Sequence, residues 1–235
     1  MRAHRVRALL MGGQACVFYG AAEFSRDTDF AILAEVANLA RLRRALDDLR
    51  AEPIAVPPFE LKYLRRGHVL HFRCQHPDAL RMRVDVMSRM RGVDCFAKLW
   101  RRRTTLSLPD KTRCDLLPLP GLVQAKKTQR DKDWPMIRRL VEAHYFAHHT
   151  KPNRSQLRFW LTELRTAQLL VKVAHSHPGL TESLAARRPM LACALAGKTA
   201  ELEQSLLAEE LAVRAEDKDY WLPLRQELEA LRHAL

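Results

Sequence analysis

The chain has 235 residues, of which 47% are hydrophobic, so it can bury one large core or two small ones. Its formal net charge is +13, but residues 201–235 carry nine acidic side chains against four Lys or Arg, which leaves +18 on residues 1–200. No stretch approaches a membrane span, no C-x-x-C pair indicates a zinc site or disulfide framework, and the five scattered cysteines fit a reducing cytoplasm. A basic body of this size suggests RNA, DNA or nucleotide phosphates as partner, although an Arg-favouring coding bias explains it equally well.

The first half of the chain mixes short apolar runs with helical patterns. In chain order, these predict a helical segment over residues 4–20 broken at a Gly-Gly pair, a strand over 28–34, a leucine-striped helix over 35–50, strands over 69–74 and 81–87, and helices over 94–103 and 121–130. Prolines at three positions after residue 50 mark a loop before the second strand.

Beyond about residue 133 the periodicity is helical throughout. It predicts helices over residues 134–148 and 156–175, one starting near Thr181, and two final helices over 199–214 and 219–234. The fold class expected is therefore α+β: a small mixed sheet flanked by helices in residues 1–132, followed by an all-helical region in residues 133–235.

Three aspartates suggest chemistry. Asp27 and Asp29 stand two apart at the start of a predicted strand, so their side chains point to the same face, about 7 Å apart along the backbone. Asp85 lies between valines in a later strand, where a carboxylate is costly unless it is paired or binds a cation. Carboxylates from two neighbouring strands can hold divalent ions for phosphoryl or nucleotidyl transfer. A salt bridge from Asp85 to Arg81, Arg83 or another nearby arginine is the structural alternative.

A glycine pair precedes these acids. Gly12 and Gly13 allow backbone to approach a phosphate closely, and a helix starting there offers free N–H groups to an anion. A tight turn without any ligand explains a Gly-Gly pair equally simply.

The order of these features resembles the first motif of the DNA-polymerase-β-like nucleotidyltransferase superfamily: Gly12-Gly13-Gln14-Ala15, then Gly20, then Ser25-x-Asp27-x-Asp29-Phe30. The resemblance implies that Asp27, Asp29 and Asp85 bind Mg²⁺ or Mn²⁺ and carry catalysis, and that Gly12, Gly13 and Ser25 bind the nucleotide triphosphate. Glu23 is a departure, since related sequences often have a basic residue at that position.

A second segment, Leu122 to Asp133, is similar to the Lys-rich helix and Arg-x-Lys-Asp turn of minimal nucleotidyltransferases, which include AbiEii-type toxins. The resemblance implies that Lys126, and Lys127 second, contact the nucleotide as point charges. The alternative is that these lysines lie on a solvated helix face.

Together the motifs predict a Mg-dependent nucleotidyltransferase that moves a nucleoside monophosphate from an NTP to an acceptor and releases pyrophosphate. The basic surface favours RNA, such as a tRNA end, as acceptor, and the resemblance adds a toxin–antitoxin role with an antitoxin protein as a partner. The alternative expectation is a catalytically degenerate module of the same fold that binds nucleic acid or a partner protein.

Overall fold

The computed structural model describes residues 1–234, which form two compact units. The sheet unit comprises Met1–Ala125 together with the chain from Asp219 onward, and the helical unit comprises Lys126–Lys218. The two compact units divide the chain after Ala125 and again after Lys218. The domain boundary expected after residue 132 stays a prediction. Along residues 1–234 we find no helix that combines the length and the apolar character needed to cross a membrane.

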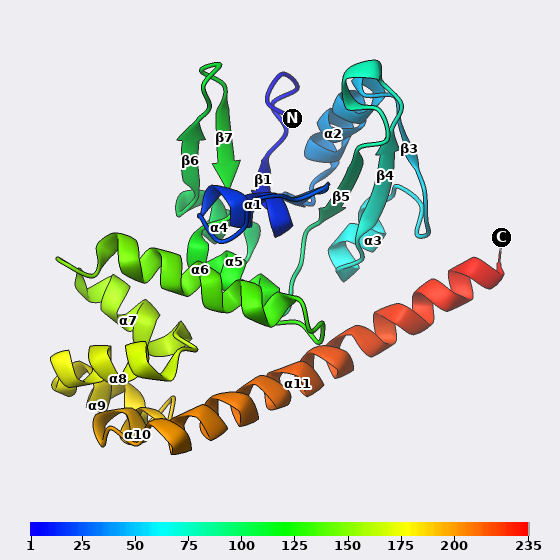
Figure 1. Ribbon diagram of the computed structural model, residues 1–235. Helices are drawn as coiled ribbons and strands as arrows, with labels where there is room; N and C mark the ends of the chain where they lie inside the picture. Colours follow the sequence, from blue (N-terminus) through cyan, green and yellow to red (C-terminus); the bar gives the residue numbers. More distant parts are fainter. Residues whose placement is uncertain (235) are drawn as a thin grey trace. The chain divides into compact units, whose positions relative to one another are not determined.

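The described part of the sheet unit contains a seven-stranded sheet in the order β3-β4-β5-β2-β1-β7-β6 (Figure 1). Strand β2 (Asp27–Ile32) runs parallel to β5 (Arg83–Met87), and β1 (Ala8–Met11) runs parallel to β7 (Arg113–Leu116). The other neighbours pair antiparallel and include β3 (Ala51–Pro53), β4 (Leu70–Cys74) and β6 (Thr104–Ser107). A mixed sheet flanked by helices confirms the predicted α+β class.

One face of β4, β5 and β2 packs on two helices. These are α2 (Val36–Asp48), whose buried stripe alternates with outward arginines, and the short α3 (Leu61–Arg66). Their shared apolar core includes Leu42, Leu46, Tyr63, Leu64, Leu70, Phe72, Val84 and Val86. Because strand side chains alternate between faces, the residues between these apolar positions project from the opposite face. Further helices of the unit are α1 (Gly12–Phe18), α4 (Phe96–Arg101) and α5 (Leu119–Lys126), and η1 (Pro77–Ala79) is a single 3₁₀ turn.

The C-terminal segment belongs to the sheet unit through contacts with the chain around α3. The Glu227 carboxylate is 2.8 Å from Nε2 of the buried His68 and also pairs with Arg66. The Tyr220 hydroxyl and the Leu224 side chain lie close to Gly67. These contacts hold the end of α11 (Thr199–His233) against the sheet unit, although this helix begins in the helical unit.

Residues 8–11 are a strand, which corrects the helix expected over residues 4–20. All four residues of β1 are buried, and β1 lies between β2 and β7 inside the sheet. A four-residue apolar run suits a buried strand and a helix equally well, so its neighbours decide. The hairpin of β6 and β7 is also absent from the predicted elements, because its side chains are mostly exposed or half-buried and leave no apolar alternation.

The helical unit contains α6 (Asp133–His148), α7 (Arg154–Glu163), α8 (Ala167–Ser176), α9 (Pro178–Ala185), α10 (Leu191–Leu195) and the first part of α11. The all-helical character expected after residue 133 is confirmed. The single helix expected over residues 156–175 is two helices, and α7 begins with a capping box between Asn153 and Gln156. The two final helices expected are one continuous helix, α11, with Pro223 inside it.

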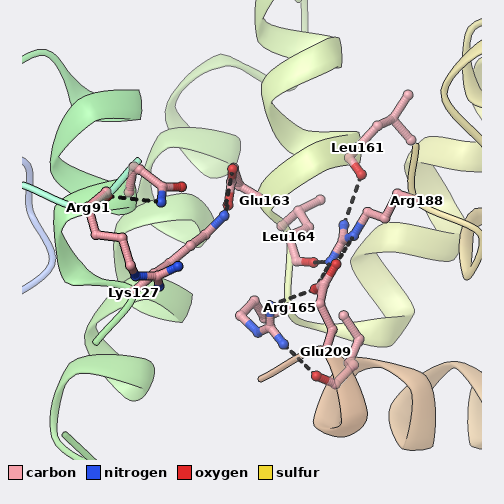
Figure 2. A network of polar contacts seen from close by, with 10 residues as sticks. Arg91, Lys127, Leu161, Glu163, Leu164, Arg165, Arg188 and Glu209 are labelled. Atoms are coloured by element: carbon pink, nitrogen blue, oxygen red, sulfur yellow. Dashed lines mark hydrogen bonds and ion pairs between the residues drawn. The ribbon is translucent and has the colours of Figure 1, made fainter. Parts of the chain in front are cut away.

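A buried arginine ties the helical unit together (Figure 2). Arg188, 6% exposed, donates to the backbone carbonyls of Leu161 and Leu164 and to Glu209, with Nη2 3.0 Å from Oε2. Arg165 donates to the same carboxylate, at 2.8 Å. Burial alone would raise the pKa of Glu209, but the two arginines outweigh burial and hold this pKa below its usual value. The network therefore connects α7, the segment before α10, and α11 through ionised groups.

Candidate active site

The expected carboxylates lie on one face of the sheet. Strands β2 and β5 are parallel, and their register sets Asp29 opposite Asp85 and Asp27 opposite Arg83. Neighbouring strands lie about 4.8 Å apart, so Asp29 and Asp85 are adjacent residues on one face. That face is opposite to the apolar core, because Val84 beside Asp85 belongs to the core cluster.

The glycine pair packs directly against two of the predicted site residues. Gly12 has φ +67°, and a Cβ placed on it would come within 1.9 Å of Oδ2 of Asp29. A Cβ on Gly13 would come within 2.3 Å of Oγ of Ser25. The Ser25 hydroxyl donates to the backbone carbonyl of Asp27 at 3.3 Å. Only glycines allow this close approach, so the first residues of α1, Ser25 and Asp29 form one local cluster.

Asp85 is held by two basic side chains. Its Oδ1 accepts from Nε of Arg83 at 2.9 Å, and Nδ1 of His71 is also 2.9 Å away. The side chain is largely buried, and burial would raise the pKa of Asp85, but hydrogen bonds from His71 and Arg83 outweigh it and lower this pKa. Asp85 is therefore ionised at neutral pH, and the structural alternative of an arginine pair is present alongside the register with Asp29.

One nitrogen of the His71 ring lies within hydrogen-bond distance of both a carboxylate and a guanidinium. Nδ1 of His71 is 2.9 Å from the Asp85 carboxylate and 3.0 Å from Nη2 of Arg83. One ring nitrogen cannot donate to the carboxylate and accept from the guanidinium at once. The tautomer of His71 therefore decides which contact is a hydrogen bond: Nδ1 with a proton donates to Asp85, and Nδ1 without one accepts from Arg83.

Arg83 interacts electrostatically with all three predicted carboxylates. Its hydrogen bond to Asp85, together with attraction to Asp85, Asp27 and Asp29, raises the pKa of Arg83. Within residues 1–234 no group of three His, Cys, Asp or Glu side chains stands close enough to hold a metal ion. His71 and Arg83 are the site residues that the sequence reasoning did not assign. Their signal is alternation, because each stands next to a buried apolar residue of its strand.

The two predicted lysines are engaged in ion pairs within the helical unit. Nζ of Lys126 is 3.0 Å from Oδ1 of the buried Asp133, and Nζ of Lys127 is 2.8 Å from Glu163 (Figure 2). Their side chains are 14% and 16% exposed, so neither lies on a solvated helix face. Burial would raise the pKa of Asp133, but Lys126, Thr128 and Arg130 outweigh it and lower this pKa.

No family model matches the chain, and no curated protein is significantly similar to it.

Proposed function

We propose that this protein is a nucleotidyltransferase that moves a nucleoside monophosphate from an NTP to an acceptor hydroxyl. The observation that carries the proposal is the register of Asp29 with Asp85 on parallel strands, with the Gly12 backbone packed on the Asp29 carboxylate. Carboxylates on neighbouring strands beside a glycine turn are the groups that nucleotidyl transfer uses to hold a divalent cation next to a phosphate. The resemblance of the sequence motifs to nucleotidyltransferases supports the same chemistry.

The proposed reaction is a substitution at the α-phosphorus of the NTP. The acceptor oxygen attacks the α-phosphorus, a P–O bond forms, and the bond to the leaving pyrophosphate breaks. The acceptor proton passes to a carboxylate; Asp85 is ionised and can accept it, and its lowered pKa makes it a weak base for this step. Gly12, Gly13 and Ser25 would contact the β- and γ-phosphates through backbone N–H and hydroxyl groups.

The donor types fit a divalent cation. Asp27, Asp29 and Asp85 supply carboxylate oxygens, the ligands that Mg²⁺ and Mn²⁺ prefer, but along residues 1–234 they are not gathered closely enough to hold an ion, so metal binding would have to draw their side chains together. When bound there, the ion would neutralise charge on the triphosphate and orient it. Arg83 competes for the same carboxylates, so loading with metal requires Arg83 to share or release Asp85.

The roles of Lys126 and Lys127 remain part of the proposal. To contact a nucleotide, each lysine would have to leave its carboxylate, Asp133 or Glu163. The triphosphate carries more negative charge than either carboxylate, which favours this exchange of one anion for another. RNA as acceptor rests on the +18 formal charge of residues 1–200. A toxin role, an antitoxin partner and a cytoplasmic location rest on the motif resemblance and the cysteine pattern alone.

One observation favours the second candidate function, a non-catalytic module of the same fold that binds nucleic acid or a protein. Asp85 already has two basic partners, Arg83 and His71, and needs no metal to be stable in the sheet. In that case the carboxylates and Arg83 would be a structural ion-pair cluster.

Transfer of label from α-³²P-NTPs to total RNA separates the two functions. We expect the wild type to label RNA in the presence of Mg²⁺, and both Asp29→Asn and Asp85→Asn to lose at least about 100-fold of the rate. Asp47→Asn, which changes an exposed carboxylate on α2, is the matched control and keeps the wild-type rate. Equal labelling by Asp85→Asn and the wild type would contradict the enzyme proposal. RNA binding without labelling by any NTP would favour the binding module.

A further inference from the structure

A basic cavity lies beside the carboxylate cluster on the sheet unit. It has a volume of about 520 Å³ and is lined by Arg73, Gln75 and Arg81. Arg73 is on β4, and Gln75 and Arg81 are in the connection from β4 to β5. The register sets Arg73 opposite Arg83, so Arg73 projects from the same face as the carboxylate cluster.

Both arginine side chains of the cavity are exposed, and within residues 1–234 neither has a carboxylate partner. Glu52 stands opposite Arg73 in the register of β3 and β4, but no ion pair joins them in the described chain. Each guanidinium presents five N–H donors and no acceptor, and its fork matches phosphate oxygens. Two unpaired guanidiniums that line one cavity are therefore suited to an anion with several oxygens.

The β4–β5 hairpin fixes the backbone of Arg81. Arg81 has φ +63°, a left-handed conformation that is costly for a residue with a Cβ. The hairpin holds it there, since the Arg81 N–H donates to the Cys74 carbonyl at 2.8 Å, and the Cys74 N–H donates to Met82 at 2.9 Å. Glycine or asparagine would adopt this conformation at lower cost. Arg5, Arg50 and Lys111 also have positive φ, so this conformation belongs to the turn; its consequence here is that the Arg81 side chain is held on the cavity wall.

The position of the cavity narrows the class of ligand. Arg73, Arg83 and Asp27 form one register row across β4, β5 and β2. At about 4.8 Å between strands, Arg73 stands roughly 10 Å from Asp27. A polymer whose end reaches the carboxylates would pass over Arg73 and place a neighbouring phosphate there. A free NTP bound at the glycine turn does not need a second phosphate site two strands away.

We propose that the Arg73–Arg81 cavity binds a backbone phosphate of a single-stranded RNA acceptor. The acceptor role rests on the nucleotidyltransferase function proposed above. Phosphate contacts position a nucleic acid without reading its sequence, so the cavity sets where the RNA end lies and not which RNA is chosen.

Binding of a short fluorescein-labelled single-stranded RNA, followed by anisotropy over a salt series, tests the proposal. The variant carries both Arg73→Gln and Arg81→Gln. The matched control carries Arg44→Gln and Arg113→Gln, two exposed arginines of the same unit, one of them on α2 across the sheet. Both double variants lose the same charge, and thermal melts verify that both are folded.

We expect the cavity variant to bind RNA about tenfold more weakly at 0.1 M salt, with a log–log salt slope shallower by about 0.7, because one single-strand phosphate contact contributes about 0.7. The control variant loses the same long-range charge as the cavity variant but no phosphate contact, so its RNA affinity stays within about twofold of the wild type. ATP affinity stays unchanged in both variants.

Equal RNA affinity of the cavity and control variants would overturn the proposal. A loss of ATP affinity with RNA affinity intact would overturn it too, since the cavity would then hold a nucleotide phosphate. The readout needs no turnover, so the two proposals fail separately. If the wild type has no transfer activity and the cavity variant binds RNA more weakly than the control, the enzyme proposal is refuted and the RNA-site proposal is supported. If the wild type is active and the cavity and control variants bind RNA equally, only the RNA-site proposal is refuted.

Discussion

Replacing Arg83 is the most direct test of whether a metal ion uses the three carboxylates. The Arg83 guanidinium is 2.9 Å from Oδ1 of Asp85 and also attracts Asp27 and Asp29. A divalent cation held by the same carboxylates is repelled by this arginine and competes with it. We therefore expect Arg83→Gln, which keeps an N–H donor near Asp85 but removes the positive charge, to bind Mn²⁺ more tightly than the wild type.

The size of this effect follows from Coulomb's law. Two unit charges 4 Å apart interact by about 1 kcal/mol in water and by about 4 kcal/mol at an effective dielectric constant of 20. The Arg83 side chain is 41% exposed, so screening by solvent favours the lower part of this range. An effect of about 1.4 kcal/mol corresponds to a tenfold lower Kd for Mn²⁺.

Electron paramagnetic resonance measures free Mn²⁺ in a titration without nucleotide or turnover. The control is Arg73→Gln, which removes the same charge one strand away and leaves the Arg83–Asp85 contact intact. A Kd for Arg83→Gln that is unchanged or higher than that of the wild type would refute the competition. Absence of Mn²⁺ binding in both proteins would remove the metal from the proposed function.

Three further outcomes are expected. Gly12→Ala lowers the free energy of unfolding in urea by about 2 kcal/mol more than Gly20→Ala, because both glycines have positive φ but only a Cβ on Gly12 meets Asp29. Equal losses would show that Asp29 yields without cost. Arg188→Leu destabilises the helical unit by about 3 kcal/mol in the same assay, since Glu209 loses a buried partner, and a loss under about 1 kcal/mol would contradict this. Burial and the nearby His148 lower the pKa of His144 to about 4. Its folded pKa is below the unfolded value, so its contribution to stability is present above about pH 6.5 and is lost as pH falls toward 4. The urea midpoint of His144→Gln should therefore fall less between pH 7 and pH 5 than that of the wild type.

Periodicity along the chain predicts elements whose two faces differ strongly. The expected strands over residues 28–34 and 81–87 correspond to β2 and β5, and the leucine-striped helix over residues 35–50 corresponds to α2. Short elements without such contrast need their neighbours. Residues 8–11 are uniformly apolar, and only pairing with β2 and β7 makes them a strand.

The sequence by itself determined which residue types are available to the site. It identified Asp27, Asp29 and Asp85, the glycines next to them, and the basic character of residues 1–200. Only the tertiary structure decided which side chains meet: Asp29 beside Asp85, Arg83 facing all three acids, and Lys126 held by Asp133 in the helical unit. The reason is physical. Alternation within a strand is local, whereas the register between β2 and β5 depends on fifty residues of intervening chain and on the core that they build.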